Sequence, residues 1–224
     1  MPHAIVLLSG GLDSATCLRI AQSEGFDVLA LSFDYGQRHR VELDRARSLA
    51  ARYGAVEHRI EKLDFPAPSA SALTDRAQSV PRHALGQVPI PSTYVPARNT
   101  LFLAHALAWA EGAGARDIFV GANALDYSGY PDCRPEFLEA FESMANLGTR
   151  AGVEGHGFRV RAPLIAMTKA DIVRRASALG LDFSLTSSCY DPGPQGEACG
   201  ACDSCLLREK GFREAEIVDP VRGK

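Results

Sequence analysis

The chain has 224 residues, of which 46% are hydrophobic and 23% charged, so it can bury a sizeable core and is not disordered. Its net charge of −3 and its pI of about 6.1 exclude a global basic field that would draw it onto nucleic acid or an anionic membrane. No apolar run reaches the ~20 residues that span a bilayer, and the start MPHAIVLL lacks the basic region of a signal peptide. We therefore expect a cytoplasmic protein with no membrane partner, whose six cysteines are free thiols, metal ligands or catalytic groups rather than disulfides.

Short apolar strands alternate with longer amphipathic helices along the chain. Strands are expected at 4–9, 27–34, 56–60, 117–121 and 158–162, and helices at 13–24, 38–53, 99–112, 135–151 and 168–179. This alternation predicts an α/β fold with a doubly wound, mostly parallel sheet and helices on both faces. Ligands of such sheets bind beyond the carboxyl ends of the strands, so the segments SGGLDS, SFDYGQ and GANALDY are expected to border the site.

Two segments interrupt the alternation. Residues 65–96 carry six of the 13 prolines and predict a lid or substrate loop, with room for a short helix. Residues 186–212 are rich in cysteine and glycine and predict a separate small module. The expected division is an α/β domain at 1–185 and a four-cysteine module with a C-terminal tail at 186–224.

The segment Ser9-Gly10-Gly11-Leu12-Asp13-Ser14 joins the first strand to the first helix without the lysine of a Walker loop. Glycines allow the backbone to approach a ligand, and the amides of the turn and the helix N-terminus form an array of donors for an anion. The two serine hydroxyls add donors, and Asp13 is placed to cap the helix or to help hold Mg²⁺. The alternative is a plain strand–turn–helix connection with a good cap.

The hexapeptide resembles the PP-loop of the N-type ATP pyrophosphatases, an adenine nucleotide alpha hydrolase-like fold. The resemblance implies cleavage of ATP between the α- and β-phosphates, with the loop holding pyrophosphate and AMP passing to an oxygen of the substrate. It implies nucleotide contacts from a run of neighbouring residues: Leu8, Ser9, Gly10, Gly11, Leu12, Asp13, Ser14, Ala15, Thr16, Cys17 and Leu18. Cys17 alone is most simply explained as packing.

Four cysteines stand close together near the C-terminus, namely Cys189, Cys199, Cys202 and Cys205. The spacing C-x9-C-x2-C-x2-C without a nearby histidine favours a closed tetrahedral Zn²⁺ site, one per chain and structural rather than catalytic. Because the segment has few large apolar residues, bound metal would supply most of its folding energy. An iron–sulfur cluster is the alternative, since C-x2-C-x2-C also occurs in cluster proteins.

Polar groups also follow the other strands, where they suit a planar heteroaromatic substrate. A carboxylate or phosphate ligand would offset the unfavourable position of Arg98 at a helix start, as would a simple surface salt bridge. Cys133 is either a catalytic thiol or a plain loop cysteine, and Lys169 either reaches a phosphate or lies on the surface. Single charges such as Arg40 and Glu42 are interpreted as solvated.

Taken together, six segments resemble the 7-cyano-7-deazaguanine synthases of the queuosine pathway, namely SGGLDSATCL, FDYGQRH, YVPARN, GANALDYSGYPDCRPEF, the PL…TK segment that ends at Lys169, and SCY…CGACDSCLLR. The resemblance runs from residue 4 to about residue 212. It implies an ATP-dependent ligase that adenylates 7-carboxy-7-deazaguanine, captures ammonia as an amide, and activates the amide with a second ATP for dehydration to the nitrile. It also implies one structural Zn²⁺, Mg²⁺ with ATP and a homodimer. Without an RNA-binding appendage or glutaminase domain, we expect no direct nucleic-acid contact and ammonia from solution.

The residue roles expected on these grounds fall into three sets. The catalytic set is Ser9, Asp13, Ser14 and Lys169; the nucleotide set is 8–18 with Phe33, Arg98 and Gly121; the substrate set is Tyr35, Gln37, Arg98, Asn99, Asn123, Asp126, Tyr127, Tyr130, Asp132, Cys133 and Arg134. Two other functions remain open, a PP-loop tRNA thiolase and a non-enzymatic nucleotide- or zinc-binding module.

Overall fold

The computed structural model describes residues 1–65, 71–84, 90–124 and 129–221. Its strands are β1 (His3–Leu7), β2 (Asp27–Asp34), β3 (Glu57–Lys62), β4 (Asp117–Phe119) and β5 (Arg159–Arg161). Its α-helices are α1 (Leu12–Ser23), α2 (Val41–Arg52), α3 (Arg98–Ala113), α4 (Pro135–Gly148), α5 (Arg150–Val153), α6 (Lys169–Ala178) and α7 (Asp203–Ala215). Two short 3₁₀ helices are η1 (Pro131–Cys133) and η2 (Phe183–Leu185).

The five strands form one sheet in the order β3-β2-β1-β4-β5, and each neighbouring pair is parallel. Ile5 of β1 lies beside Leu29 of β2 and Ile118 of β4. The chain therefore builds outward from β1 to β3 and then restarts on the other side of β1. The predicted α/β sheet is confirmed, and its order reverses between β1 and β4, where ligands of such sheets bind.

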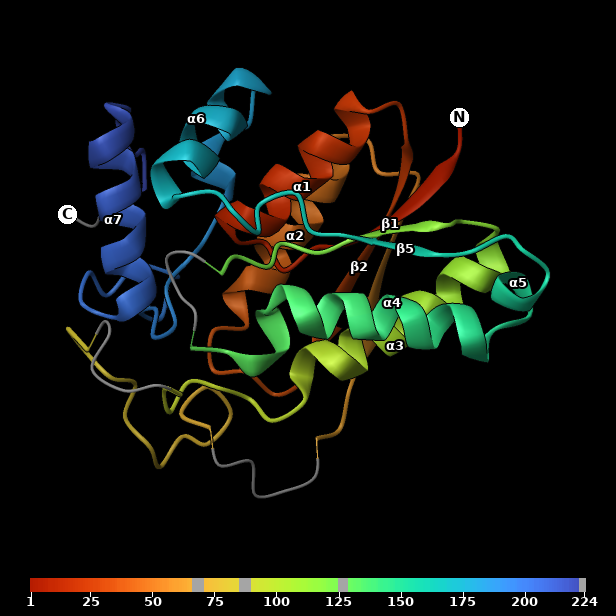
Figure 1. Ribbon diagram of the computed structural model, residues 1–224. Coiled ribbons are helices and arrows are strands. Elements are labelled where there is room, and N and C mark those ends of the chain that lie inside the picture. The colour runs from red at the N-terminus through yellow and green to blue at the C-terminus, as the bar shows by residue number, and fades with distance from the viewer. Residues whose placement is uncertain (66–70, 85–89, 125–128, 222–224) are drawn as a thin grey trace.

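Side chains of β1, β2 and β4 alternate between two hydrophobic cores, one on each face of the sheet. Val6 of β1 packs into a core with α1, α2, α6 and α7, whereas Ile5 packs into a core with α3, α4 and α5. Figure 1 shows α3 and α4 together on one side of the sheet and α1 and α2 on the other. Burial of both faces explains why the strands contain long apolar runs.

Local signals explain where the observed elements differ from the expected ones. The helix expected at 135–151 is interrupted at Thr149, whose side chain caps α5 by accepting a hydrogen bond from the amide of Gly152. The helix expected from residue 38 begins at Val41; residues 38–40 form a turn, in which the amide of Arg38 donates to the carbonyl oxygen of Leu73. Helix α7 was not predicted, and the described residues of 65–96 contain no helix.

The C-terminal segment packs against the α/β core. Helix α7 lies along α6 (Figure 1), and the rings of Phe183 and Phe212 meet edge to face with centroids 4.8 Å apart. The amide of His83 donates to the carbonyl oxygen of Ala201 at 3.1 Å, so part of 65–96 also contacts the cysteine segment. The division at residue 185 and the lid remain predictions. None of the helices in the described ranges is both long and apolar enough to cross a membrane.

Candidate active site

The loop between β1 and α1 is held together by its two serines. The Ser9 and Ser14 hydroxyl oxygens lie 3.1 Å apart, and the amide of Gly11 donates to Ser9 Oγ at 3.3 Å. Ser14 Oγ also donates to the carbonyl oxygen of Gly11 at 3.0 Å. Helix α1 is capped by Gly11 without a side-chain hydrogen bond, so Asp13 does not act as its cap. The sequence of the hexapeptide is therefore not explained by a plain turn followed by a capped helix.

Two glycines allow this loop to approach other elements closely. Gly10 has φ +88°, and an added Cβ would overlap the carbonyl oxygen of Glu42 at the start of α2. A Cβ at Gly121, in the loop after β4, would lie 3.1 Å from the amide nitrogen of Ser14. The carbonyl oxygen of Gly10 accepts a hydrogen bond from the amide of Ser187 at 2.9 Å. Segments after β1, β4 and η2 therefore meet at one point.

Asp13 and Lys169 form an ion pair although 156 residues separate them in the chain. Lys169 Nζ lies 2.8 Å and 2.7 Å from the two carboxylate oxygens of Asp13. Lys169 is the first residue of α6, which is fixed by a capping box between Thr168 and Asp171. A cation and a carboxylate therefore stand together at the N-terminus of α1, which is a favourable position for phosphate.

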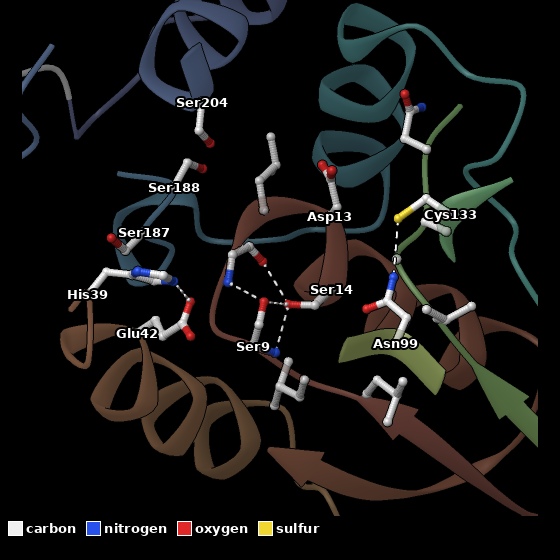
Figure 2. Close-up of a pocket in the computed structure, with 18 of the residues that line it drawn as sticks. Ser9, Asp13, Ser14, His39, Glu42, Asn99, Cys133, Ser187, Ser188 and Ser204 are labelled. Atoms are coloured by element: carbon white, nitrogen blue, oxygen red, sulfur yellow. Dashed lines mark hydrogen bonds and ion pairs between the residues drawn. The ribbon is translucent and has the colours of Figure 1, made fainter. Parts of the chain in front are cut away.

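These groups border a pocket of about 270 Å³ at the carboxyl ends of β1, β2 and β4. Predicted residues that line it are Leu8, Ser9, Gly11, Leu12, Asp13, Ser14, Phe33, Tyr35, Arg98, Asn99, Gly121, Asn123, Tyr130, Cys133 and Lys169. Figure 2 shows Ser9 and Ser14 between Glu42 on one side and Asn99 and Cys133 on the other. The structure thus brings most of the predicted site together.

The remaining predicted residues lie elsewhere. Ala15, Thr16, Cys17 and Leu18 are buried in α1, and burial raises the pKa of the Cys17 thiol well above its usual range. Asp132 and Arg134 line a neighbouring hollow, and Gln37 is buried behind Glu42. Asp126 and Tyr127 lie outside the described residues.

Arg98 begins α3 as a partly buried cation whose Nε atom is buried. The Tyr35, Phe102 and Tyr130 rings surround its guanidinium with centroids 5.9–6.0 Å away. Its Nε has no hydrogen-bond partner, and among the described residues no carboxylate lies within ion-pair distance. Partial burial of a cation that lacks a carboxylate costs free energy, which an anionic ligand would offset. The sequence left two explanations for Arg98, an anionic ligand and a surface salt bridge. The contacts of the described residues favour the ligand.

Asp132 and Cys133 position the start of α3. The Asp132 carboxylate accepts the amide of Asn99 at 3.0 Å, and Asn99 Nδ2 donates to Cys133 Sγ at 3.1 Å. Burial raises the pKa of Cys133 to about 11, so its thiol stays protonated at neutral pH. Asn123 Nδ2 donates to the carbonyl oxygens of Leu164 and Met167 and thereby joins the loop after β4 to the segment before α6. The sequence left Cys133 as either a catalytic thiol or a plain loop cysteine. Its raised pKa argues against a catalytic thiolate.

The sequence interpretation missed several pocket residues, namely His39, Glu42, Ser187, Ser188, Ser204 and Arg208. Glu42 is not solvated, since its side chain is 14% exposed, and burial raises its pKa to about 7. Its position four residues before Ala46 and seven before Leu49, on the apolar stripe of α2, was an available signal. Burial likewise lowers the pKa of His39 to about 3.

The four predicted cysteine ligands come together at the N-terminus of α7. Their Sγ atoms all lie within 4.8 Å of one another. Cys189 Sγ accepts the amides of Asp191 and Cys199, and Cys199 Sγ accepts that of Cys202 at 3.3 Å. Hydrogen bonds from Cys189 and Cys205 lower the pKa of Cys202. The cluster could hold a metal ion, with backbone donors directed at its sulfurs.

Comparison with known proteins places this site in a family. A family profile described as "Queuosine biosynthesis protein QueC" matches residues 3–216. The chain belongs to this family. A protein of Geobacter sulfurreducens named 7-cyano-7-deazaguanine synthase is 61% identical over 219 residues, which cover 97% of this chain and 92% of the relative. One of the same name from Methylococcus capsulatus is 58% identical over 222 residues and 99% of both chains.

A solved structure shows the same fold at lower identity. The chain superposes on a 4-thiouridine synthetase, solved as an RNA complex with bound ATP, with a TM-score of 0.52 and 19% identity. The match covers 96% of this chain and 50% of that one. This likeness bears on the fold alone, and membership of the QueC family confirms the resemblance inferred from the sequence motifs.

Proposed function

We propose that the chain converts 7-carboxy-7-deazaguanine, ammonia and ATP into 7-cyano-7-deazaguanine, with AMP and pyrophosphate as the products of ATP cleavage. Family membership supports the overall reaction. The observation that carries the mechanism is the placement of the Ser9–Ser14 loop, the Asp13–Lys169 pair and Arg98 around one pocket. The groups that could bind phosphate and the arginine that could pair with a carboxylate then line one pocket.

Within this proposal the loop binds the β- and γ-phosphates that leave as pyrophosphate. Amides of Gly10 and Gly11 and the Ser9 and Ser14 hydroxyls supply neutral donors, and Lys169 supplies positive charge. Asp13 is the carboxylate that would contact Mg²⁺, and that ion would neutralise charge on the phosphates. Because no Walker lysine is present, the loop suits pyrophosphate as a leaving group rather than transfer of the γ-phosphoryl group.

The remaining substrate roles rest on the chemistry of the pocket wall. Arg98 pairs with the carboxylate of the deazaguanine, which orients one oxygen toward the α-phosphate of ATP. Tyr35 and Tyr130 lie beside this guanidinium and provide flat surfaces for a planar base. Phe33 and Gly121 border the nucleotide side of the pocket. The roles of Asp126, Tyr127 and Arg134 stay predictions from sequence.

We extend the proposal to one Zn²⁺ held by Cys189, Cys199, Cys202 and Cys205. Four sulfurs already within 4.8 Å of one another fit the tetrahedral geometry of that ion, and a site closed by four ligands stabilises structure rather than reacting. Metal analysis should find about one zinc per chain. Iron with visible absorbance would support a cluster instead.

Incubation with ATP, Mg²⁺, ammonium and 7-carboxy-7-deazaguanine tests the proposed reaction. Mass spectrometry should show AMP, pyrophosphate and the nitrile, and absence of both AMP and nitrile would overturn the assignment. A homodimer, the lack of direct nucleic-acid contact and a cytoplasmic location remain parts of the proposal that rest on the resemblance and on the net charge of −3. Light scattering in solution tests the dimer.

A further inference from the structure

Glu42 stands in the pocket as a carboxylate without a permanent cation. The carboxylates of the described pocket wall are Asp13 and Glu42, and only Asp13 has a lysine or arginine within ion-pair distance. Glu42 Oε1 accepts Gln37 Nε2 at 2.9 Å, and Oε2 lies 3.4 Å from His39 Nε2. Figure 2 shows the Glu42 carboxylate beside His39, next to the Ser9–Ser14 pair.

The neighbours of Glu42 fix its position. Gln37 Nε2 also donates to the carbonyl oxygen of Phe33 at 3.0 Å, and its Oε1 accepts the amide of Tyr35 at 2.8 Å. The Gln37 side chain is fully buried, so its hydrogen bonds to Phe33, Tyr35 and Glu42 hold the carboxylate against the end of β2. The arrangement resembles a base oriented by a second group rather than a mobile surface glutamate.

The charged and titratable groups facing Glu42 set its protonation. His39, from the loop after β2, is kept neutral because burial lowers its pKa to about 3. Burial raises the pKa of Glu42 to about 7, although the hydrogen bond from Gln37 and the charge of Arg98 on α3 both lower it. Tyr35 is buried, and its pKa lies above the usual range. Glu42 is therefore balanced between its two protonation states near neutral pH.

The proposed reaction needs a base at this place. Ammonia in neutral solution is almost entirely ammonium, whose nitrogen has no lone pair to attack carbon. A carboxylate attracts that cation and can accept its proton. Arg98 and Glu42 line the same pocket, so a substrate carboxylate paired with Arg98 would share that cavity with Glu42.

We propose that Glu42, held by Gln37 beside the Ser9–Ser14 loop, binds ammonium and removes one proton from it. This deepens the proposed function and rests on it. The proton passes to the Glu42 carboxylate, and the freed lone pair forms the C–N bond to the acyl carbon. The C–O bond to AMP breaks, a second proton moves from nitrogen to the released phosphate of AMP, and Glu42 returns its proton to solvent.

The test separates activation of the carboxylate from capture of nitrogen. Glu42→Gln keeps the size of the side chain and an acceptor for Gln37, and Asp44→Asn on the exposed face of α2 is the matched control. Exchange of labelled pyrophosphate into ATP, with the carboxylated deazaguanine and without ammonium, measures adenylation. Amide formation is then followed with ammonium, and hydroxamate formation with hydroxylamine, which is uncharged at neutral pH.

We expect Glu42→Gln to keep pyrophosphate exchange within a few-fold of wild type and to lose about 10²-fold or more of its amide formation at pH 7. Hydroxylamine should restore product formation to near the wild-type rate, and the deficit with ammonium should narrow as pH rises. The Asp44→Asn variant should match wild type in all three assays.

Three outcomes would overturn the role of Glu42. Equal losses with ammonium and hydroxylamine would indicate positioning of the acyl group. A loss of exchange, or a raised KM for the deazaguanine in exchange, would indicate recognition of the base. Full ammonium activity would remove the role directly. If wild type itself shows no exchange that depends on the carboxylate, the proposed function fails instead.

Discussion

Substitution of Gly10 by alanine tests whether the loop needs both a left-handed backbone and close approach to α2. Gly10 has φ +88°, and an added Cβ would overlap the carbonyl oxygen of Glu42 and lie 2.9 Å from the amide nitrogen of Ala46. Gly25 has nearly the same φ, +86°, with nothing within 4 Å of an added Cβ. Gly25→Ala therefore carries the backbone strain without the overlap.

The two variants should differ by the cost of the overlap. Left-handed backbone at an alanine costs about 1–2 kcal/mol, so Gly25→Ala should lower the free energy of unfolding by about that amount. Overpacking adds about 1–3 kcal/mol, which brings the cost of Gly10→Ala to about 2–5 kcal/mol. Urea unfolding, followed by fluorescence of the single tryptophan, Trp109, measures both.

Activity should separate the variants more sharply than stability. The overlap moves Gly10 away from α2 and strains the hydrogen bond from the amide of Ser187, so Gly10→Ala should lose pyrophosphate exchange while Gly25→Ala keeps it. Equal losses of stability, together with exchange retained in Gly10→Ala, would refute the close approach of loop and helix.

Substitutions at Glu42, Cys202 and Lys169 test three separate contacts, with Cys133→Ser as the control for Cys202→Ser. Because burial raises the pKa of Glu42 from 4.5 to about 7, folded wild type should lose stability as pH rises through that range. Glu42→Gln should then be more stable by about 3 kcal/mol at pH 8 and equal at pH 4, whereas parallel urea curves would contradict burial of the charge. Cys202→Ser should lower metal content and melting temperature together, and Cys133→Ser should leave metal content unchanged. Lys169→Met should reduce pyrophosphate exchange at least ~10²-fold with the circular dichroism of wild type, and normal exchange would show that the pair with Asp13 is only structural.

The fold was largely predictable because its central strands β1 and β2 are apolar on both faces. The expected strand at 27–34 matches β2, since six consecutive buried residues separate its two polar ends. Thr149 is a typical N-cap residue and indicated a break, but the long amphipathic pattern of 135–151 was interpreted as one continuous helix. Helix α7 was missed because it contains Cys205, and the cysteine spacing predicted a metal loop rather than a helix.

Residues of the site could be predicted from the sequence only where they belong to a short motif of neighbouring residues. The Ser9–Ser14 loop and the four cysteines have characteristic spacings, and their geometry follows from neighbours in sequence. Glu42 belongs to no such motif: its helical spacing to Ala46 and Leu49 indicates burial, but its hydrogen bond with Gln37 and its place in the pocket depend on the folded chain. Pairing of Asp13 with Lys169 depends likewise on packing between helices far apart in the chain.

The four-cysteine segment lines the pocket as well as bringing together four sulfurs that could hold a metal ion. Ser187, whose amide holds the carbonyl oxygen of Gly10, lies two residues before Cys189. Arg208, on α7 beyond Cys205, also lines the pocket and is anchored by a buried ion pair with Asp219. Because the segment has few apolar side chains of its own, a bound metal would fix Cys189 and through it the amide that orients Gly10. In the proposed reaction, a metal held by the four cysteines would therefore affect adenylation by holding one wall of the pocket, without contacting the substrates itself.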